Sequence, residues 1–505
     1  MAKIAAIVTL LLITLGAIGV SAEERADSEL PARVATHHAI AAVIVPPARV
    51  PARELEYDAI AETLPLTDAK GTPTATIFTV AYLTAAAPGR ERPISFVFNG
   101  GPGAASVFLH LGALGPRIME TPANGTVPAP PVRLVDNAAT WLGFTDLVFV
   151  DPVGTGFSRG KGKEENPDKP FWDMRADITS LGTVIRLWLT RHERWASPIF
   201  LVGESYGGFR AATLAQALPR DVGVTVSGLV LVSPALDLSA LHQDERDLLA
   251  GAFYLPSYAA TAAIHAPRPD GDQAAVERFA LSDYLVGLAG LKGEPPPGDP
   301  FIIKVAEMAG VSEDVVRRHR GRIPRHVFSR EIRRGAGEVV SLYDSTIVRP
   351  ARPDEREDDA TDPVLQPAVA AYGAAFNAYA ADALGYRTEL AYRVLSPEVS
   401  RQWNWQGDRR GDGLGLAMSS LETALLQHPA TKVLIANGRY DLVTPYLSSR
   451  WLVDQLGVPP ALRAAIRLRV YEGGHMMYMR PDSRLLLARD AADLYAAPNA
   501  AAPSQ

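Results

Sequence analysis

Gly203-Glu204-Ser205-Tyr206-Gly207-Gly208 follows a short apolar run, residues 199–202, and precedes a segment with a helical pattern, residues 209–218. G-x-S-x-G between a strand and a helix is typical of a nucleophile elbow, a sharp turn that exposes its serine. Small neighbours let the strand and the helix approach each other without Cβ clashes. The stretch therefore predicts a strand, a strained turn and a helix, with Ser205 as a candidate nucleophile.

A second stretch, Gly156-Phe157-Ser158-Arg159-Gly160, matches the same pattern. It also lies beyond an apolar run, residues 147–150, but several residues intervene. The residues that follow, 161–170, are charged and contain proline instead of a helical pattern. We therefore favour Ser205 over Ser158, and a structural serine at a tight turn is the alternative for Ser205.

The chain has 505 residues, of which 47% are hydrophobic, and a formal net charge of -6. This length allows one large domain with an insertion, or two domains. The small net charge argues against a nucleic-acid partner. Because the chain has no cysteine, we expect no disulfide, no thiol nucleophile and no cysteine-based metal site.

The N-terminal residues resemble a targeting segment. Lys3 precedes a continuously apolar or small stretch, residues 4–20, and Val20-Ser21-Ala22 fits a small-x-small cleavage site. We predict a signal peptide over residues 1–22, a periplasmic or secreted location and no stable membrane anchor after cleavage; a retained anchor is the alternative. Residues 23–58, rich in alanine and proline, are expected to form a loosely packed leader.

Strand-like and helical segments alternate between about residues 76 and 236 and again after residue 397. This alternation predicts a mostly parallel central sheet flanked by helices, with a core formed by residues 59–236 and 397–505. The alternation is interrupted over residues 237–396, which contain three consecutive prolines, a basic stretch and an acidic stretch. We expect this segment to be a mainly helical insertion, a lid over the catalytic face.

Together these features predict an α/β-hydrolase fold, in which the triad follows the chain order Ser, Asp or Glu, His. Two late loops follow strand-like runs, one reaching Asp441 and the other reaching Gly473-Gly474-His475. We predict that Asp441 orients His475 and that His475 takes the proton of Ser205. A turn or capping role is the alternative for Asp441, and a surface or packing role is the alternative for His475.

Backbone N–H groups are expected to form an oxyanion hole. Tyr206 supplies one, and the loop Asn99-Gly100-Gly101-Pro102-Gly103, which follows the strand-like run 94–98, supplies the other. A structural turn is the alternative for this loop. A phosphate-binding loop is disfavoured, because the Gly-Lys-Ser/Thr end that such a loop requires is absent here. The chain has neither a His-Glu-x-x-His motif nor a dinucleotide-binding glycine pattern, so we expect no metal and no organic cofactor.

Several ordered blocks resemble the serine carboxypeptidase family. They are residues 99–106, 151–158 and 203–208 and the loops around Asp441 and His475. The resemblance implies the release of single amino acids from the C-terminal ends of peptide substrates through an acyl-enzyme. It also implies that the second block, which contains Ser158, is a loop near the active site and does not supply the nucleophile.

The resemblance further implies a binding site for the terminal carboxylate of the substrate, formed by Asn99, the backbone of Gly100, and Glu204. It assigns the two oxyanion donors to Gly101 and Tyr206. A carboxylic acid that faces a carboxylate is most useful in its protonated form. We therefore expect an acidic optimum for peptide cleavage.

Three positions depart from the family pattern. Ala113 stands where the family usually has a second glutamic acid, Val97 where it has tryptophan, and Ala104 where it has cysteine. Glu204 thus lacks its usual acidic partner, and for the nearby His110 a packing role is favoured over contact with the site. The departures leave a serine esterase or acyltransferase on the same scaffold as the alternative function; the intact triad argues against a non-catalytic binding protein.

Overall fold

The computed structural model describes residues 30–40, 54–85, 91–241, 247–266, 272–352, 361–405 and 415–496. The predicted signal peptide, residues 1–22, lies outside these ranges. Within them, no helix is both long and apolar enough to cross a membrane.

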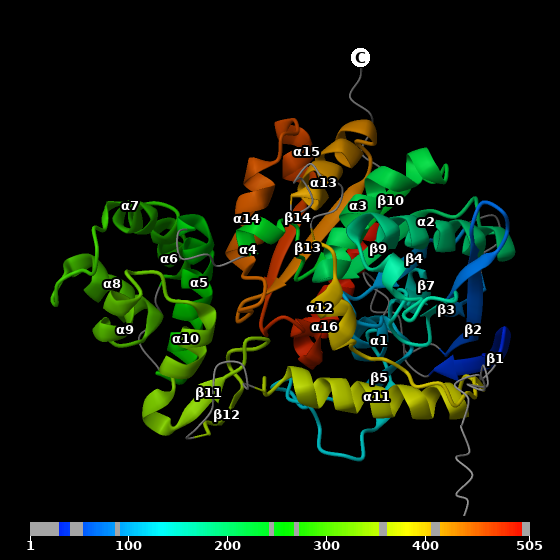
Figure 1. The fold of residues 1–505 in the computed structure, drawn as a ribbon, viewed down its shortest axis with the longest axis horizontal. Helices are drawn as coiled ribbons and strands as arrows, with labels where there is room; N and C mark the ends of the chain where they lie inside the picture. The colour runs from blue at the N-terminus through cyan, green and yellow to red at the C-terminus, as the bar shows by residue number, and fades with distance from the viewer. Residues whose placement is uncertain are drawn as a thin grey trace, which may run out of the picture.

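A large twisted sheet forms the centre of the molecule (Figure 1). In spatial order its strands are β1 (Arg33–Ile40), β2 (Leu55–Thr67), β3 (Pro73–Leu83), β7 (Asp146–Val150), β4 (Ile94–Phe98), β9 (Ile199–Glu204), β10 (Val226–Val232), β13 (Lys432–Gly438) and β14 (Arg467–Tyr471). The strands from β7 to β14 are parallel, and β1, β2 and β3 continue the sheet in antiparallel pairing. The mostly parallel sheet predicted from the sequence is thereby confirmed.

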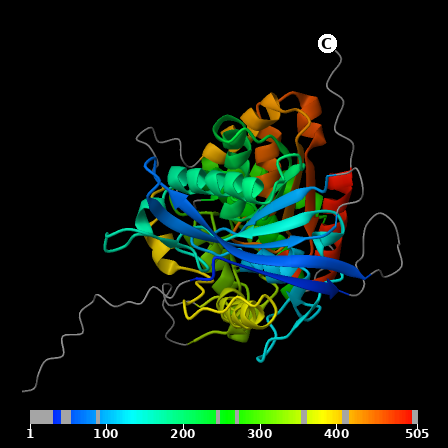
Figure 2. The ribbon, with the colours of Figure 1, turned by 90° about the vertical axis from the view of Figure 1, so that its right-hand side faces the viewer.

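The parallel strands are buried on both faces, which explains their unbroken apolar sequences. Every residue of β4, β7 and β9 is buried. On one face lie α2 (Met174–Arg191), α3 (Tyr206–Asp221) and α13 (Leu416–Gln427), and on the other lie α11 (Leu365–Asp382) and α16 (Pro481–Ala496). Figure 2 shows α2 and α11 on opposite sides of the sheet.

The leader expected over residues 23–58 contains a strand that we did not predict. β1 pairs with β2 in antiparallel register from Arg33 opposite Glu62 to Ile40 opposite Leu55. The strand lies at the edge of the sheet, and its residues alternate between exposed and partly buried up to Ile40, which is buried. An edge strand with little buried surface needs few large apolar residues, so its composition resembles that of a linker.

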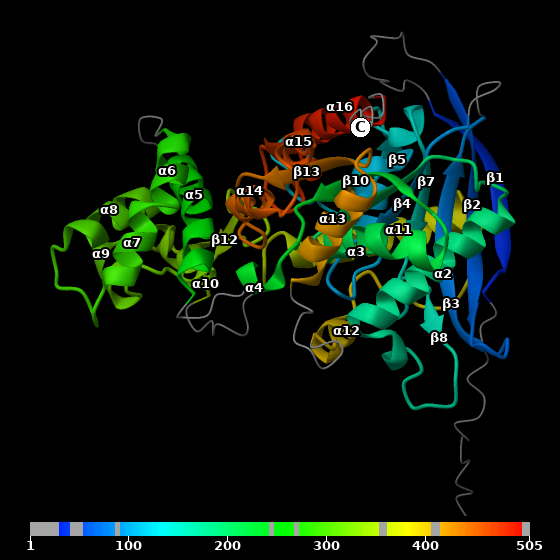
Figure 3. The same ribbon diagram turned by 90° about the horizontal axis from the view of Figure 1, so that it is seen from above.

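Part of the segment between β10 and β13 forms a helical lobe beside the sheet (Figures 1 and 3). The lobe contains α5 (Leu248–His265), α6 (Gln273–Ala280), α7 (Asp283–Gly290), α8 (Pro300–Ala309), α9 (Glu313–Arg318) and α10 (Arg325–Glu331). It has its own apolar core, in which the rings of Tyr258 and Phe328 stack with centroids 3.9 Å apart. These helices lie within the insertion predicted over residues 237–396, whereas α11, which belongs to the same predicted segment, packs against the sheet instead of the lobe.

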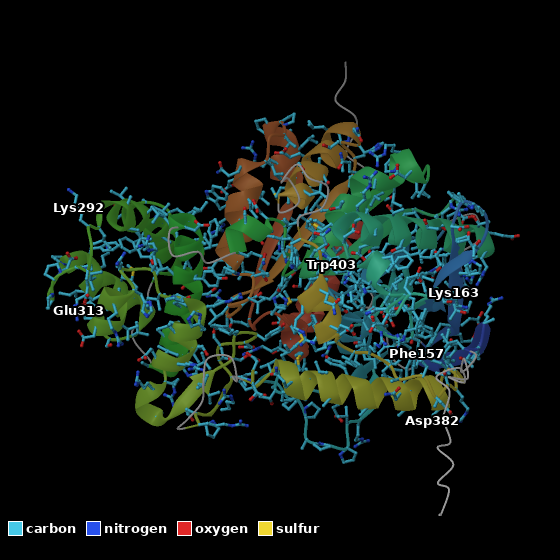
Figure 4. All side chains as sticks on the ribbon, in the orientation of Figure 1. Phe157, Lys163, Lys292, Glu313, Asp382 and Trp403 are labelled. Atoms are coloured by element: carbon cyan, nitrogen blue, oxygen red, sulfur yellow. The ribbon has the colours of Figure 1, made fainter. Side chains whose placement is uncertain are left out.

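Figure 4 places Lys292 and Glu313 at the outer edge of this lobe, and Phe157 and Asp382 near the opposite end of the molecule.

The remaining short elements are α1 (Val107–Leu109), the π-helix η1 (His110–Leu114), β5 (Arg117–Met119), β6 (Leu134–Asp136), η2 (Trp141–Gly143), β8 (Arg159–Gly160), η3 (Lys169–Phe171), α4 (Leu238–Leu241), η4 (Arg334–Ala336), β11 (Glu338–Val340), β12 (Val348–Pro350), α12 (Pro397–Gln402), α14 (Tyr446–Gln455), α15 (Pro460–Ala465) and η6 (Met477–Met479).

Candidate active site

Ser205 lies in the strained turn between β9 and α3. Its backbone angles are φ 58° and ψ -122°. Residues other than glycine rarely adopt this region, which typically raises the energy by about 1–3 kcal/mol. The turn is so tight that a Cβ atom on Gly203 would lie 1.9 Å from the carbonyl oxygen of Gly207. The glycines of the motif are therefore required for the strand and the helix to meet at this angle.

His475 and Asp441 form the buried pair predicted from the late loops. The Nδ1 atom of His475 lies 2.8 Å from Oδ2 of Asp441. The other oxygen of Asp441, Oδ1, accepts hydrogen bonds from the backbone N–H groups of Val443 and Thr444, at 2.7 and 2.9 Å. Because these donors hold the carboxylate, it accepts the Nδ1–H of the imidazole and leaves Nε2 available as a base.

Two residues of the β10 end connect the serine to this pair. The backbone N–H of Ser205 donates to the carbonyl of Val232 at 2.9 Å. The next residue, Ser233, donates through its hydroxyl to the carbonyl of His475 at 2.9 Å, and its own carbonyl oxygen lies 3.0 Å from the hydroxyl oxygen of Thr444. Ser205, Asp441 and His475 thus follow the carboxyl ends of β9, β13 and β14, parallel strands of the same sheet, at the edge where such sheets bind ligands.

The electrostatic environment favours protonation of the His475 imidazole. Burial lowers the pKa of His475, but the Asp441 carboxylate beside it and the negative charge of Glu204 outweigh burial, and the net pKa lies above the ordinary 6.5. An imidazolium stabilised in this way is the form that a general base takes after it has accepted a proton.

The glycine-rich loop after β4 lies directly against the elbow. A Cβ atom on Gly100 would lie 2.5 Å from the backbone nitrogen of Tyr206 and 2.9 Å from Cβ of Ser205. Gly101 follows with φ 100°, a conformation that favours glycine. The loop therefore brings bare backbone to the side of the serine, as an oxyanion hole requires.

A buried ion pair between α2 and α3 anchors the backbone of this loop. Arg210 on α3 pairs with Asp177 on α2, with Nε 2.7 Å from Oδ2, and its Nη1 donates to the carbonyl of Asn99 at 2.6 Å. The side chain of Asn99 is oriented as well, because its Oδ1 accepts the backbone N–H of Leu109 at 3.0 Å. The Nδ2 atom of Asn99 must therefore point away from α1, the helix that contains Leu109.

Asn99 and Glu204 are in direct contact. Nδ2 of Asn99 donates to Oε2 of Glu204 at 2.7 Å, and both side chains are almost completely buried. Burial raises the pKa of the Glu204 carboxyl to about 7, although the positive charge of His475 and the two hydrogen bonds to the carboxyl oppose the shift. This carboxyl therefore ionises at a higher pH than an ordinary glutamic acid.

Two residues of the constellation were not predicted from the sequence. The hydroxyl of Tyr478, on η6, donates to Oε2 of Glu204 at 2.7 Å. The hydroxyl of Thr444 donates to Oδ2 of Asp441 at 2.7 Å. Thr444 follows Asp441 by three residues, a spacing typical of a side-chain-capped turn, whereas no spacing rule links Tyr478 to Glu204.

The insertion reaches the site through the segment between β11 and β12. The carbonyl of Tyr343 accepts the backbone N–H of His475, and the Tyr343 ring stands nearly perpendicular to the imidazole, with centroids 5.3 Å apart. Arg325, on α10, donates to the carbonyls of Leu442 and Val443 at 3.4 and 3.3 Å. The insertion therefore contacts both late loops of the predicted triad.

The remaining candidates have packing roles. Ser158 is fully buried, and its hydroxyl donates to the carbonyl of Asp151 at 2.6 Å and accepts the N–H of Phe78 at 2.8 Å. His110 stacks on Phe149 with centroids 4.1 Å apart, and burial lowers its pKa to about 3. In the part of the chain that the structure describes, no group of three or more histidine, aspartate or glutamate residues is arranged to hold a metal ion.

The fold and this constellation define a class: the chain has an α/β-hydrolase fold with a serine, a histidine and an aspartate at the ends of its parallel strands. Residues 73–237 match the family model described as "Serine carboxypeptidase". The resemblance predicted from the sequence motifs is confirmed by this match.

Curated relatives match the sequence of this chain over a limited length. A serine carboxypeptidase-like protein of Arabidopsis thaliana is 30% identical over 126 residues, which cover 25% of this chain and 24% of that protein. A pheromone-processing carboxypeptidase of Saccharomyces cerevisiae is 32% identical over 133 residues, which cover 25% of this chain and 17% of that protein. The matched part thus spans about a quarter or less of these relatives' own length.

Two matches among solved structures are weak in both sequence and superposition. Esterase E22 has a TM-score of 0.37 and 13% identity, and the alignment covers 86% of this chain and 99% of that chain. VinJ has a TM-score of 0.35 and 13% identity, with 86% of this chain and 98% of that chain covered.

Proposed function

We propose that the protein is an exported serine carboxypeptidase, which releases C-terminal amino acids from peptides through an acyl-enzyme. The observation that carries the proposal is the 2.7 Å hydrogen bond between Asn99 and Glu204. It joins, next to Ser205, the two side chains that the family resemblance assigns to the terminal carboxylate of the substrate. The match of residues 73–237 to serine carboxypeptidases supports the same function. Export rests on the signal-like residues 1–22.

In the proposed reaction, Oγ of Ser205 attacks the carbonyl carbon of the last peptide bond while Nε2 of His475 accepts its proton. Asp441 stabilises the resulting imidazolium through the Nδ1 hydrogen bond. The backbone N–H groups of Gly101 and Tyr206 donate to the oxyanion of the tetrahedral intermediate. Protonated His475 then gives its proton to the leaving amine, and an acyl-enzyme on Ser205 remains. His475 then takes a proton from water as the water oxygen attacks the ester carbonyl; the bond to Oγ breaks, Oγ regains a proton from His475, and the shortened peptide leaves with a new carboxyl group.

Glu204 selects substrates with a free C-terminus in this scheme. A protonated Glu204 donates a hydrogen bond to the terminal carboxylate, together with Nδ2 of Asn99 and the backbone N–H of Gly100. An ionised Glu204 repels the same carboxylate. Because burial raises the pKa of this carboxyl to about 7, binding of a free-acid peptide weakens as the pH rises through this value.

The test compares a blocked dipeptide with a free C-terminus, its C-terminal amide and a simple ester over pH 5 to 9. We expect the free acid to have the highest kcat/KM below pH 7 and to lose this advantage above it. Release of the terminal amino acid, followed by amine detection, identifies the cleaved bond. Equal rates for the free acid and the amide at every pH would contradict the proposal.

A serine esterase or acyltransferase is the second candidate, and one observation favours it. Ala113 stands where the family usually has an acid, so the carboxylate site has one ionisable group fewer than expected. This candidate predicts that the ester is cleaved faster than the free-acid peptide at pH 5 to 6, with no difference between the acid and its amide. The same three substrates therefore distinguish the two functions.

A further inference from the structure

Glu204 is held by two donors that end on one oxygen. Nδ2 of Asn99 and the hydroxyl of Tyr478 each lie 2.7 Å from Oε2. Among the described residues, both hydrogen bonds to this carboxyl thus use Oε2, and Oε1 is the oxygen that remains for a ligand. Tyr478 is completely buried, so its ring has little freedom to leave this position.

Two tyrosines lie against Gly112, the residue before Ala113, where the family usually has an acid. A Cβ atom on the preceding residue, Gly112, would lie 2.8 Å from Cε2 of Tyr478 and 2.4 Å from the hydroxyl of Tyr372. Both tyrosines are completely buried. The absence of a side chain at Gly112 therefore leaves room for these rings, which come from η6 and α11.

We propose that Tyr478 is a positioning residue, which holds Oε2 of Glu204 and directs Oε1 toward the terminal carboxylate of the substrate. The inference rests on the proposed carboxypeptidase function. Ala113 carries no acid where the family usually has one, so Glu204 does not share a proton with a second carboxyl there; its contact is instead a neutral hydroxyl, that of Tyr478. A hydroxyl that donates to a carboxylate also favours its ionised form.

The titration of Glu204 depends on groups from several elements. Asp441 and His475 face it from the two late loops, Tyr478 from η6, and Tyr343 and Tyr372 from the insertion and α11. Burial raises the pKa of Glu204, whereas His475, Tyr478 and Asn99 lower it. Removal of the Tyr478 hydroxyl alone must therefore raise the pKa further.

The experiment uses Tyr478→Phe in the full chain, with Tyr372→Phe as the matched control. Tyr372 is an equally buried tyrosine of the same cluster, and its hydroxyl has no hydrogen-bond partner among the described residues. Infrared difference spectroscopy follows the protonated carboxyl of Glu204 against pH, with Glu204→Gln as the blank. Since a hydrogen bond to a charged group is lost, we expect Tyr478→Phe to move the midpoint upward by about one pH unit. Tyr372→Phe should leave the midpoint unchanged.

Kinetics provide the second readout. In Tyr478→Phe the rise of KM for a free-acid dipeptide should move to higher pH with the infrared midpoint, while hydrolysis of a simple ester keeps its pH profile. An unchanged midpoint in Tyr478→Phe, or an equal shift in Tyr372→Phe, would overturn the inference. So would a Tyr478→Phe enzyme in which both substrates change equally.

The infrared titration needs no substrate, so it separates the two proposals. If the wild-type protein cleaves the free acid and its amide equally, the carboxypeptidase function fails, whereas a shifted midpoint still shows that Tyr478 holds Glu204. If the wild-type protein prefers the free acid and the midpoint does not move, the function stands and the role of Tyr478 is refuted.

Discussion

The replacement Glu204→Gln should stabilise the protein at pH 8 and have a much smaller effect at pH 5. The Glu204 side chain is buried, and burial raises its pKa from the ordinary 4.5 to about 7. Between these values the unfolded chain loses the proton while the folded protein keeps it. The folded state then binds more protons than the unfolded state, so its stability falls as the pH rises.

The magnitude follows from the size of the shift. One pKa unit corresponds to about 1.4 kcal/mol, so a carboxyl that titrates near 7 instead of 4.5 lowers the free energy of unfolding by about 3 kcal/mol at pH 8. At pH 5 the penalty is less than about 1 kcal/mol, because the folded carboxyl is still protonated. A glutamine has no charge to bury, and its amide oxygen can accept the hydrogen bonds of Asn99 and Tyr478.

The assay is urea unfolding of the wild-type protein and the variant at both pH values, followed by tryptophan fluorescence. Glu204→Gln should gain about 2 kcal/mol more at pH 8 than at pH 5. Glu62→Gln is the control, because Glu62 is also completely buried but contacts Arg191 and His192 at 2.8 and 2.6 Å. Although burial raises the pKa of Glu62, these partners lower it overall, so its charge stabilises the fold above the ordinary pKa. Glu62→Gln should therefore lose stability at pH 8.

A Glu204→Gln variant whose gain is the same at pH 5 and pH 8 would refute the raised pKa. The same conclusion would follow if Glu204→Gln and Glu62→Gln changed stability in the same direction at pH 8.

Two further predictions concern the reacting groups. Ser205→Ala should lower kcat by about 10⁵-fold or more without a change in fold, because the nucleophile is lost; active-site titration and circular dichroism measure this, and a variant with full hydrolysis would contradict the role of Ser205. Gly100→Ala should lower kcat by about 10²-fold or more, since its Cβ would lie 2.5 Å from the nitrogen of Tyr206. Gly290→Ala, where a Cβ meets nothing within 4 Å, is the matched control, and equal kcat values in the two glycine variants would contradict the oxyanion assignment.

Local patterns were sufficient to predict the centre of the fold. The run 94–98 forms β4 as predicted, because a buried parallel strand is a short apolar stretch that a turn ends. The predicted helix began at residue 209, whereas α3 begins at Tyr206. Gly207 and Gly208 have low helix propensity. Only the tight geometry of the elbow explains why they form the first turn of α3.

Contacts between distant segments could not be predicted in the same way. Tyr478 is 274 residues from Glu204 along the chain, and the sequence Met-Met-Tyr-Met around it contains no motif. The sequence did show that an acid was absent at position 113, but it did not show which side chain contacts Glu204 instead. That answer required the packing of η6 and α11 against the π-helix that contains Gly112.

Glu204 and His475 have to be considered as one electrostatic unit, since the charge on each alters the pKa of the other. The pair can hold one proton either on the carboxyl or on the imidazole, and only the first form leaves His475 free to act as a base. A terminal carboxylate beside Glu204 disfavours the ionised carboxyl and thus shifts the proton to Glu204. On the proposed function, binding of a free-acid peptide therefore produces the neutral imidazole that its own cleavage needs, whereas an amidated peptide leaves more of the pair in the unreactive form.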